Sequence, residues 1–171
     1  MYDESTDERG FIMLYRNIMV AFDGSEPAKE ALVVAKNMIG DDSQATMHVV
    51  SVVSIGSLGL GGDLANSPTP GMQQIFPDMR TYDEAIDNAK KAACGQMRDA
   101  AENLLDGVEC NVTFDAVVAV KPAAGICDYA EDHKVDMIVM GRRGLGALRA
   151  MLGSVSYAVL HETSIPVVTV K

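Results

Sequence analysis

The segment VDMIVMGRRGLGALRAMLGSVS, residues 135–156, decides the fold. Its first six residues are apolar apart from Asp136, which is typical of a strand buried within a parallel sheet. The chain then passes through several glycines, and Gly153-Ser154 opens a stretch with the pattern of a short helix over 154–162. A buried strand that leads through a glycine-rich turn into a helix is the repeating unit of α/β proteins.

The same order extends outward from this segment in both directions. Apolar or alternating runs predict strands at 17–22, 45–53, 109–120, 135–140 and 165–170. Helical spacing predicts helices at 25–39, at 82–105, from 122 onward and at 154–162. Strands that alternate with helices need right-handed crossovers, so the fold class is α/β with a mostly parallel sheet and helices on both faces.

Two segments lie outside this pattern. Residues 1–15 are predicted to be a flexible acidic arm, and residues 54–80, rich in Gly, Ser and Pro, a long flexible loop. The remainder, 16–171, is expected to be one domain, since 171 residues with 48% hydrophobic side chains suffice for one core.

Composition excludes several classes of partner. A net charge of −10 should repel DNA, RNA and anionic lipid over most of the surface. No apolar stretch is long enough to span a bilayer, and the acidic start is unlike a signal peptide. Cys94, Cys110 and Cys127 are dispersed, as in proteins of reducing compartments. We therefore expect a cytoplasmic protein with no nucleic-acid or membrane partner.

The sequence holds no recognisable catalytic set. It lacks a G-x-S-x-G elbow, and no cysteine has a placed histidine partner. His48, His133 and His161 are scattered without metal-ligand spacing. No catalytic or metal-ligating residue is assigned, and we expect binding rather than turnover.

Residues 141–156 have the parts of a phosphate cradle. Glycines let the backbone approach a ligand, and the following helix start offers free N–H groups and a positive dipole end. Ser154 and Ser156 add hydroxyl groups. No acidic residue lies between Asp136 and Glu162, whereas Arg142, Arg143 and Arg149 do. A plain connection, with Ser154 as a helix cap and arginines for solubility, fits the same residues.

Asp23 follows the first predicted strand directly. Ligands of open parallel sheets bind beyond the carboxyl ends of strands, where the strand order reverses. Its carboxylate could there accept hydrogen bonds from ribose hydroxyls. Asp23-Gly24 is also ordinary turn chemistry, and the residues alone leave both interpretations open.

Three segments together resemble the universal stress protein family, over roughly residues 16–171. They are NIMVAFDGS (17–25), VDMIVMGRRG (135–144), and LGSVS (152–156) followed by IPVVTV (165–170). The resemblance implies an adenine nucleotide alpha hydrolase-like fold, with an open five-stranded parallel sheet in the order 3-2-1-4-5. The switch point would then lie between strands one and four, with Asp23 and Gly141 on either side of one crevice.

The resemblance also implies a site for ATP or AMP, with or without Mg²⁺. Gly141, Gly144 and Gly153-Ser154 match the family's phosphate and ribose motif, helped by Val155, Ser156 and the neighbouring Arg142. Asp23 matches the ribose contact, and Ala21, Val49 and Met140 match positions that border the adenine, partly through backbone groups. Residues 145–152 number eight where the family has nine. Either Gly146 absorbs the difference, or the grip on the phosphates is weaker.

The implied function is an adenine-nucleotide-binding regulator of stress responses. It would act as a homodimer through the last strand, Ile165–Val170, whose valine-rich edge invites pairing. Two alternatives remain open at this point: a nucleotide-free dimeric interaction module of the same fold, or a slow ATP hydrolase.

Overall fold

A computed structural model of the chain describes residues 15–54, 79–144 and 152–171. The predicted acidic arm up to residue 14, most of the predicted loop and Gly146 lie outside the described residues. The predicted loop, 54–80, is too long at both ends. Ser54 still belongs to a strand, and Met79 already begins a helix. Tyr15, the last residue of the predicted arm, packs half-buried against the core.

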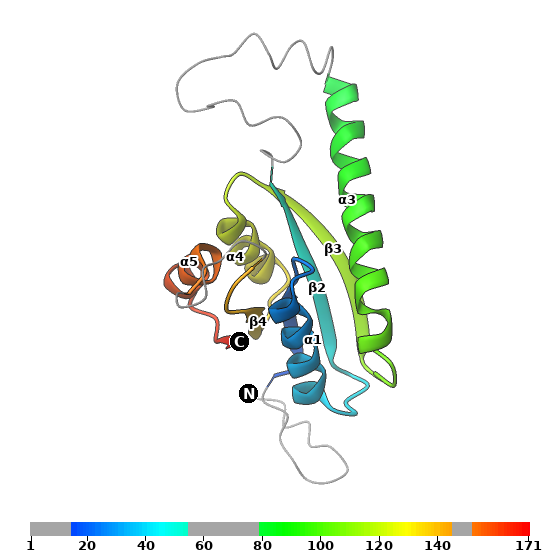
Figure 1. Cartoon of the computed structure of the whole chain (residues 1–171), viewed down its shortest axis with the longest axis vertical. Helices are drawn as coiled ribbons and strands as arrows, with labels where there is room; N and C mark the ends of the chain where they lie inside the picture. Colours follow the sequence, from blue (N-terminus) through cyan, green and yellow to red (C-terminus); the bar gives the residue numbers. More distant parts are fainter. Residues whose placement is uncertain (1–14, 55–78, 145–151) are drawn as a thin grey trace.

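Strands and helices alternate along the described chain (Figure 1). The helix expected at 82–105 begins three residues earlier, and its last turn is a separate 3₁₀ helix. The elements are β1 (Asn17–Ala21), α1 (Glu26–Ile39), β2 (Thr46–Ser54), α3 (Met79–Ala101), η2 (Glu102–Leu104), β3 (Asn111–Ala119), α4 (Pro122–Asp132), β4 (Met137–Gly141), α5 (Ser154–Glu162) and β5 (Val167–Val170).

The five strands form one parallel sheet in the order β3-β2-β1-β4-β5. This confirms the expected fold class and strand order. The order reverses between β1 and β4, since β1 continues the chain toward β2 on one side and lies against β4 on the other. The register places Ala21 beside Val50 of β2 and Met140 of β4, so these three residues form a row near the carboxyl ends of the strands.

Helices cover both faces of the sheet, and each face has its own hydrophobic cluster. Side chains alternate along β1, so Ile18 and Val20 face α1 and α3, whereas Met19 faces α4 and α5. Figure 1 shows α3 running along β2 and β3, with α4 and α5 on the opposite side. Burial on both faces explains why β1 and β4 are nearly continuous apolar runs.

Residues within the first turn set the starts of α1 and α4, as the sequence predicted. Ser25 caps α1, with its hydroxyl accepting from the Ala28 amide at 3.3 Å. Pro27 and Pro122 occupy the first turns of α1 and α4, where their missing N–H groups cost nothing.

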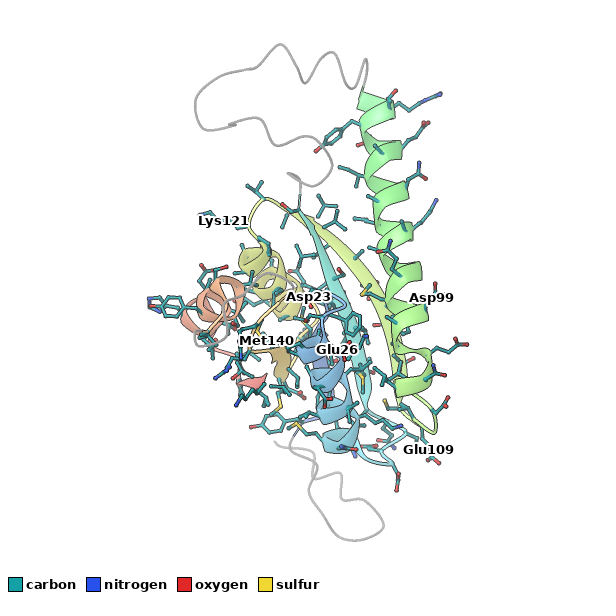
Figure 2. All side chains as sticks on the ribbon, in the orientation of Figure 1. Asp23, Glu26, Asp99, Glu109, Lys121 and Met140 are labelled. Atoms are coloured by element: carbon teal, nitrogen blue, oxygen red, sulfur yellow. The ribbon has the colours of Figure 1, made fainter. Side chains whose placement is uncertain are left out.

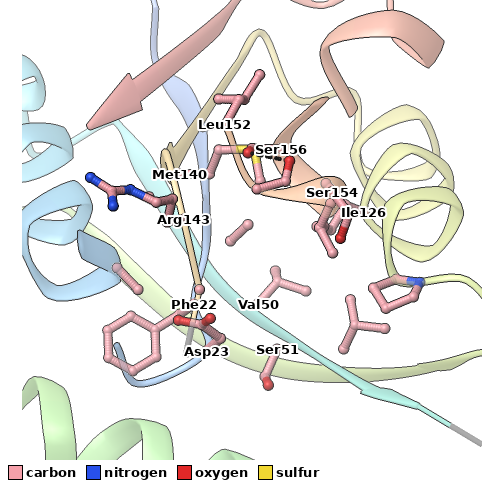
Figure 3. Close-up of a pocket in the computed structure, with 18 residues that line it drawn as sticks. Phe22, Asp23, Val50, Ser51, Ile126, Met140, Arg143, Leu152, Ser154 and Ser156 are labelled. Carbon is pink, nitrogen blue, oxygen red and sulfur yellow. Dashed lines mark hydrogen bonds between the residues drawn. The ribbon is translucent and has the colours of Figure 1, made fainter. Parts of the chain in front are cut away.

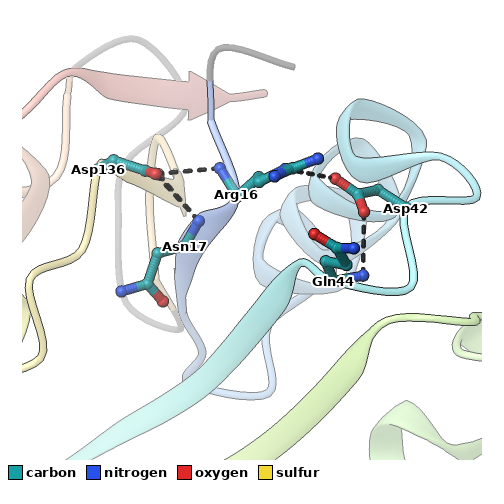
Figure 4. A network of polar contacts seen from close by, with 5 residues as sticks. All are labelled: Arg16, Asn17, Asp42, Gln44 and Asp136. Carbon is teal, nitrogen blue, oxygen red and sulfur yellow. Dashed lines mark hydrogen bonds and ion pairs between the residues drawn. The ribbon is translucent and has the colours of Figure 1, made fainter. Parts of the chain in front are cut away.

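A polar network fixes the start of β1 against β4 (Figure 4). The Asp136 carboxylate accepts from the backbone amides of Arg16 at 3.0 Å and Asn17 at 3.1 Å. The Arg16 side chain pairs with Asp42 at 2.8 Å. Charge-assisted bonds of this kind hold the two strands in one axial position.

The thiols of Cys110 and Cys127 are buried, as expected for small apolar residues. Burial raises the pKa of both thiols, which disfavours the reactive thiolate. Within the three described ranges, no helix combines the length and apolar character needed to cross a bilayer.

We expect Gly125→Ala to lower the free energy of unfolding by about 1–3 kcal/mol through overpacking. A methyl group at Gly125 of α4 would meet the Ala119 Cβ at 2.8 Å and the Val52 Cγ1 at 3.4 Å. Gly95 of α3 is the matched control, because a methyl group there meets nothing within 4 Å. Gly95→Ala should stabilise the protein by about 0.5–1 kcal/mol. Urea unfolding measures both, and equal effects would contradict the close approach of α4.

Candidate functional site

A cavity of about 620 Å³ opens at the carboxyl edge of the sheet, where the strand order reverses (Figure 3). Its walls come from the ends of β1, β2 and β4, the starts of α4 and α5, and the turns between them. It is lined by Ala21, Phe22, Asp23, Ala28, Val50, Ser51, Val52, Pro122, Ile126, Met140, Gly141, Arg143, Gly144, Leu152, Gly153, Ser154, Val155 and Ser156. A cavity of this volume is suited to a small-molecule ligand.

Asp23 occupies the rim of this cavity just past β1. Gly24 adopts a φ of +80°, a conformation that glycine reaches without steric cost, and turns the chain toward α1. The Asp23 Oδ1 accepts from the Ser25 amide at 3.0 Å, which fixes the carboxylate. Asp23 is therefore both a turn residue and an exposed acceptor at the cavity.

The backbone after β4 passes very close to two neighbouring segments. A Cβ at Gly141 would lie 2.9 Å from the Pro27 Cβ, at the start of α1. A Cβ at Gly144 would overlap the Asp23 Oδ2. A side chain at Gly141 would therefore press on the backbone of α1, whereas a side chain at Gly144 would displace the Asp23 carboxylate from its present position.

The N-terminus of α5 is tied to the end of β4 by one carbonyl group. The Arg142 oxygen accepts from the Gly153 amide at 2.9 Å and from the Ser156 hydroxyl at 2.8 Å. Gly153 is the helix cap and contributes no side chain, so Ser154 is the first helical residue rather than the cap. The first-turn amides of a helix have no intrahelical acceptor and carry the positive end of its dipole. Here Ser154, Val155 and Ser156 all line the cavity.

The hydroxyl of Ser156 has a structural task. It donates to the Arg142 carbonyl and also lies 3.0 Å from the Gly153 carbonyl, and the residue is 2% exposed. A hydroxyl has one proton, which these backbone oxygens already engage. The sequence favours the Ser156 hydroxyl as a donor toward phosphate. In the structure this hydroxyl instead holds the start of α5 against the Arg142 carbonyl.

All the residues expected from the sequence line this cavity except Val49 and Arg142. Those that do are Ala21, Asp23, Met140, Gly141, Gly144, Gly153, Ser154, Val155 and Ser156. Val49 is fully buried on the opposite face of the sheet, in the cluster with α1. Successive strand residues point to opposite faces, so Val50 lines the cavity in its place.

Arg142 is not among the residues that line the cavity, and its backbone pairs with the edge strand β5. Its amide donates to the Val170 carbonyl of β5 at 2.5 Å. The adjacent Arg143 is among the residues that line the cavity, and Figure 3 shows its guanidinium group pointing away from the other lining side chains. Arg149, the third arginine of the motif, lies outside the described residues.

Sequence reasoning missed a further set of lining residues, most of them apolar. They are Phe22, Ala28, Val50, Ser51, Val52, Pro122, Ile126 and Leu152. Two of these had a signal in the sequence: Pro122 follows a strand, and Ile126 lies one helical turn further along the same face. Val50 and Val52 could be assigned only once it was known which side chains of β2 point toward α4. An uninterrupted apolar run such as β2 does not show which of its side chains point to which face.

The cavity is chemically two-sided. Val50, Ile126 and Met140 form an apolar wall. The Asp23 carboxylate and the α5 amides provide an acceptor and a set of donors at other parts of the rim. In the view of Figure 2, Asp99 and Glu109 are drawn apart from Asp23 and Met140, whereas the acidic Glu26 of α1 is drawn beside them. Among the described residues, no group of three His, Cys, Asp or Glu side chains could hold a metal ion.

Comparison with known proteins gives a consistent picture. A universal stress protein of Methanocaldococcus jannaschii is 30% identical over 161 residues, covering 92% of this chain and 83% of that protein. The solved UspA of Lactobacillus plantarum is 22% identical with a TM-score of 0.67, covering 92% of this chain and 98% of that one.

Two further solved universal stress proteins were determined with nucleotides. The Archaeoglobus fulgidus protein in complex with dAMP has 22% identity and a TM-score of 0.56, covering 92% of this chain and 99% of that one. A universal stress protein in complex with cAMP has 20% identity and a TM-score of 0.54, covering 91% of this chain and 96% of that one. At these identities the likeness shows the fold.

The family model named "Universal stress protein family" matches residues 14–171. Because this model covers most of the sequence, the chain belongs to the universal stress protein family.

Proposed function

We propose that this protein binds an adenine nucleotide, ATP or AMP, and acts as a cytoplasmic homodimeric regulator in stress responses. The observation that carries the proposal is the convergence of the Asp23 carboxylate and the α5 amides on one cavity beside an apolar wall. A nucleoside phosphate has three parts that match these three features of the cavity. Its flat base suits the apolar wall, its ribose diol suits the carboxylate, and its anionic phosphate suits the helix amides.

Each part of the nucleotide has a suitable partner. The row of Ala21, Val50 and Met140 suits the base, and the backbone groups at the strand ends can read its edge. Asp23 is placed to accept from the ribose hydroxyls. The α5 N-terminus suits the phosphates, since helix starts favour anions through free amides and the dipole. The dAMP and cAMP complexes of the solved relatives support a nucleotide of this type.

Mg²⁺ would arrive with the phosphates rather than occupy a protein site. It is commonly held by one or two carboxylates together with substrate phosphates. Asp23 is the carboxylate among the cavity's described residues, so it is the side chain that could contact such an ion. The chemistry that the ion supplies is charge neutralisation on a triphosphate.

The first experiment is identification of the ligand that co-purifies with the protein, together with calorimetric titration of ATP and AMP. A bound adenine nucleotide, or titration with micromolar affinity, is expected. Neither bound nucleotide nor heat of binding at millimolar concentration would contradict the proposal and favour the nucleotide-free interaction module. Turnover of ATP in the same samples would favour the slow hydrolase.

We expect Gly144→Val to weaken nucleotide binding by about tenfold or more. Any side chain at Gly144 enters the space of the Asp23 carboxylate and displaces it from the cavity rim. The residue is exposed, so thermal unfolding should stay close to that of the wild type. Gly95→Val, which adds the same side chain in open space on α3, is the control and should bind normally. Unchanged affinity in Gly144→Val would remove Asp23 from the site.

The dimer can be tested at the free edge of β5. The carbonyls of Pro166 and Val170 accept from the amides of Ile138 and Arg142, so in a parallel ladder the Thr169 N–H points away from β4. Thr169→Pro removes this donor without touching the β4 pairing. We expect Thr169→Pro to be monomeric and Thr169→Ala to remain dimeric by light scattering. Two dimeric variants would place the contact elsewhere.

A further inference from the structure

A second polar cluster lies under α4, on the side away from the nucleotide cavity. His48 of β2 is its centre, and its neighbours are Asn17, Thr113, Asp115 and Tyr129. Asp115, Tyr129 and His133 also line a second cavity of about 360 Å³ between α4 and β3. None of these residues touches the glycine turn.

The hydrogen bonds define the protonation state of His48. The Asn17 side-chain amide donates to the carbonyls of His133 and Lys134 at 2.8 and 3.0 Å, so its oxygen faces His48. That oxygen lies 2.8 Å from the His48 Nε2, which must therefore carry the proton.

The other ring nitrogen of His48 is an acceptor. The Tyr129 hydroxyl donates its hydrogen bond to the Asp115 Oδ2 at 2.7 Å. The Thr113 hydroxyl is then the donor to the His48 Nδ1, at 3.0 Å. The neutral Nε2–H form satisfies every one of these groups.

A second proton on His48 would disturb this arrangement. It must enter at Nδ1, where Thr113 can no longer donate and has to rotate. The new charge would face Asp115 on β3 favourably, but His133 on α4 unfavourably, with the two imidazole centroids 5.6 Å apart. From β1 it faces the neutral Asn17, and from α4 also the phenol of Tyr129. Asp128 and Asp132 lie further along the second cavity. Burial and His133 lower the pKa of His48, and Asp115 raises it less.

Helix α4 is a wall shared by the two cavities. Pro122 and Ile126 face the nucleotide cavity, and Tyr129, the next residue on that helical face, belongs to the second cavity. Tyr129, Ile126, Val50 and Met140 pack in one hydrophobic cluster. His133 stacks on Tyr129 with ring centroids 3.8 Å apart, so a charge on either imidazole acts on the same helix end.

We propose that protonation of His48 loosens α4 from the sheet and weakens nucleotide binding in the neighbouring cavity, so that the protein releases nucleotide as the pH falls. This coupling rests on the proposed function. Binding and protonation are linked reciprocally: the nucleotide favours the α4 position that requires neutral His48, and so opposes protonation. Affinity is therefore full above the ordinary histidine value of about 6.5 and falls below it.

The test is calorimetric titration of AMP at about pH 7.5 and about pH 5 for the wild type, His48→Gln and His161→Gln. Glutamine keeps one donor and one acceptor without a titratable ring, and His161 is an exposed histidine on α5. Protonation of AMP itself affects all three proteins equally, so we compare the ratio of variant to wild-type affinity at each pH. We expect His48→Gln to match the wild type at the higher pH and to bind at least about fivefold more tightly at the lower one. His161→Gln should follow the wild type.

The outcomes separate the two proposals. An equal decline in all three proteins would overturn the coupling alone. Absence of AMP binding at the higher pH would overturn the proposed function, and the coupling with it. Nuclear magnetic resonance of the wild-type imidazoles gives a readout without any variant. AMP should lower the pKa of His48, and an unchanged value would also overturn the coupling.

Discussion

The close passage of the chain after β4 over the end of β1 is the constraint on which the site depends. Gly141 lies against Pro27, and Gly144 against the Asp23 carboxylate, with no room for a Cβ at either position. Parallel pairing of β1 with β4 brings these turns to one edge of the sheet. The Arg142 carbonyl then binds the start of α5 through Gly153 and Ser156, so the helix amides reach the same edge. These contacts together place the acceptor at β1 and the donors at α5 on one cavity.

The two faces of the sheet contribute differently to this arrangement. The face toward α1 and α3 is a closed apolar cluster in which Val49 and Leu32 are fully buried. The face toward α4 and α5 leaves open the cavity at the strand ends and the smaller one near β3. Polar groups such as His48 and Tyr129 are confined to the second face, where each has hydrogen-bond partners. A helix that borders two cavities transmits a change in one to the other if it moves as a rigid unit.

Much of the fold was predictable because its signals are local. Ser25 and Pro27 mark the start of α1, and Pro122 marks the start of α4, through hydrogen bonds and sterics within one turn of chain. The boundaries of α3 were less predictable, because its apolar stripe continues past Ala101 to Leu104 and Leu105 through a 3₁₀ turn. The roles of Val49 and Ser156 were misjudged for a different reason. Which face a residue turns to, and which carbonyl takes a hydroxyl proton, depend on neighbours distant in sequence.

By itself, the sequence determined the alternation of strands and helices, since it follows from hydrophobic periodicity over a few residues. Resemblance to a family added the strand order. Only the tertiary structure decided that Arg143 rather than Arg142 lines the cavity, and that His48 meets Asn17, Thr113 and Tyr129 under α4. The reason is physical: these contacts join residues up to 81 positions apart. Such distances close only after the sheet has assembled and the helices have packed on it.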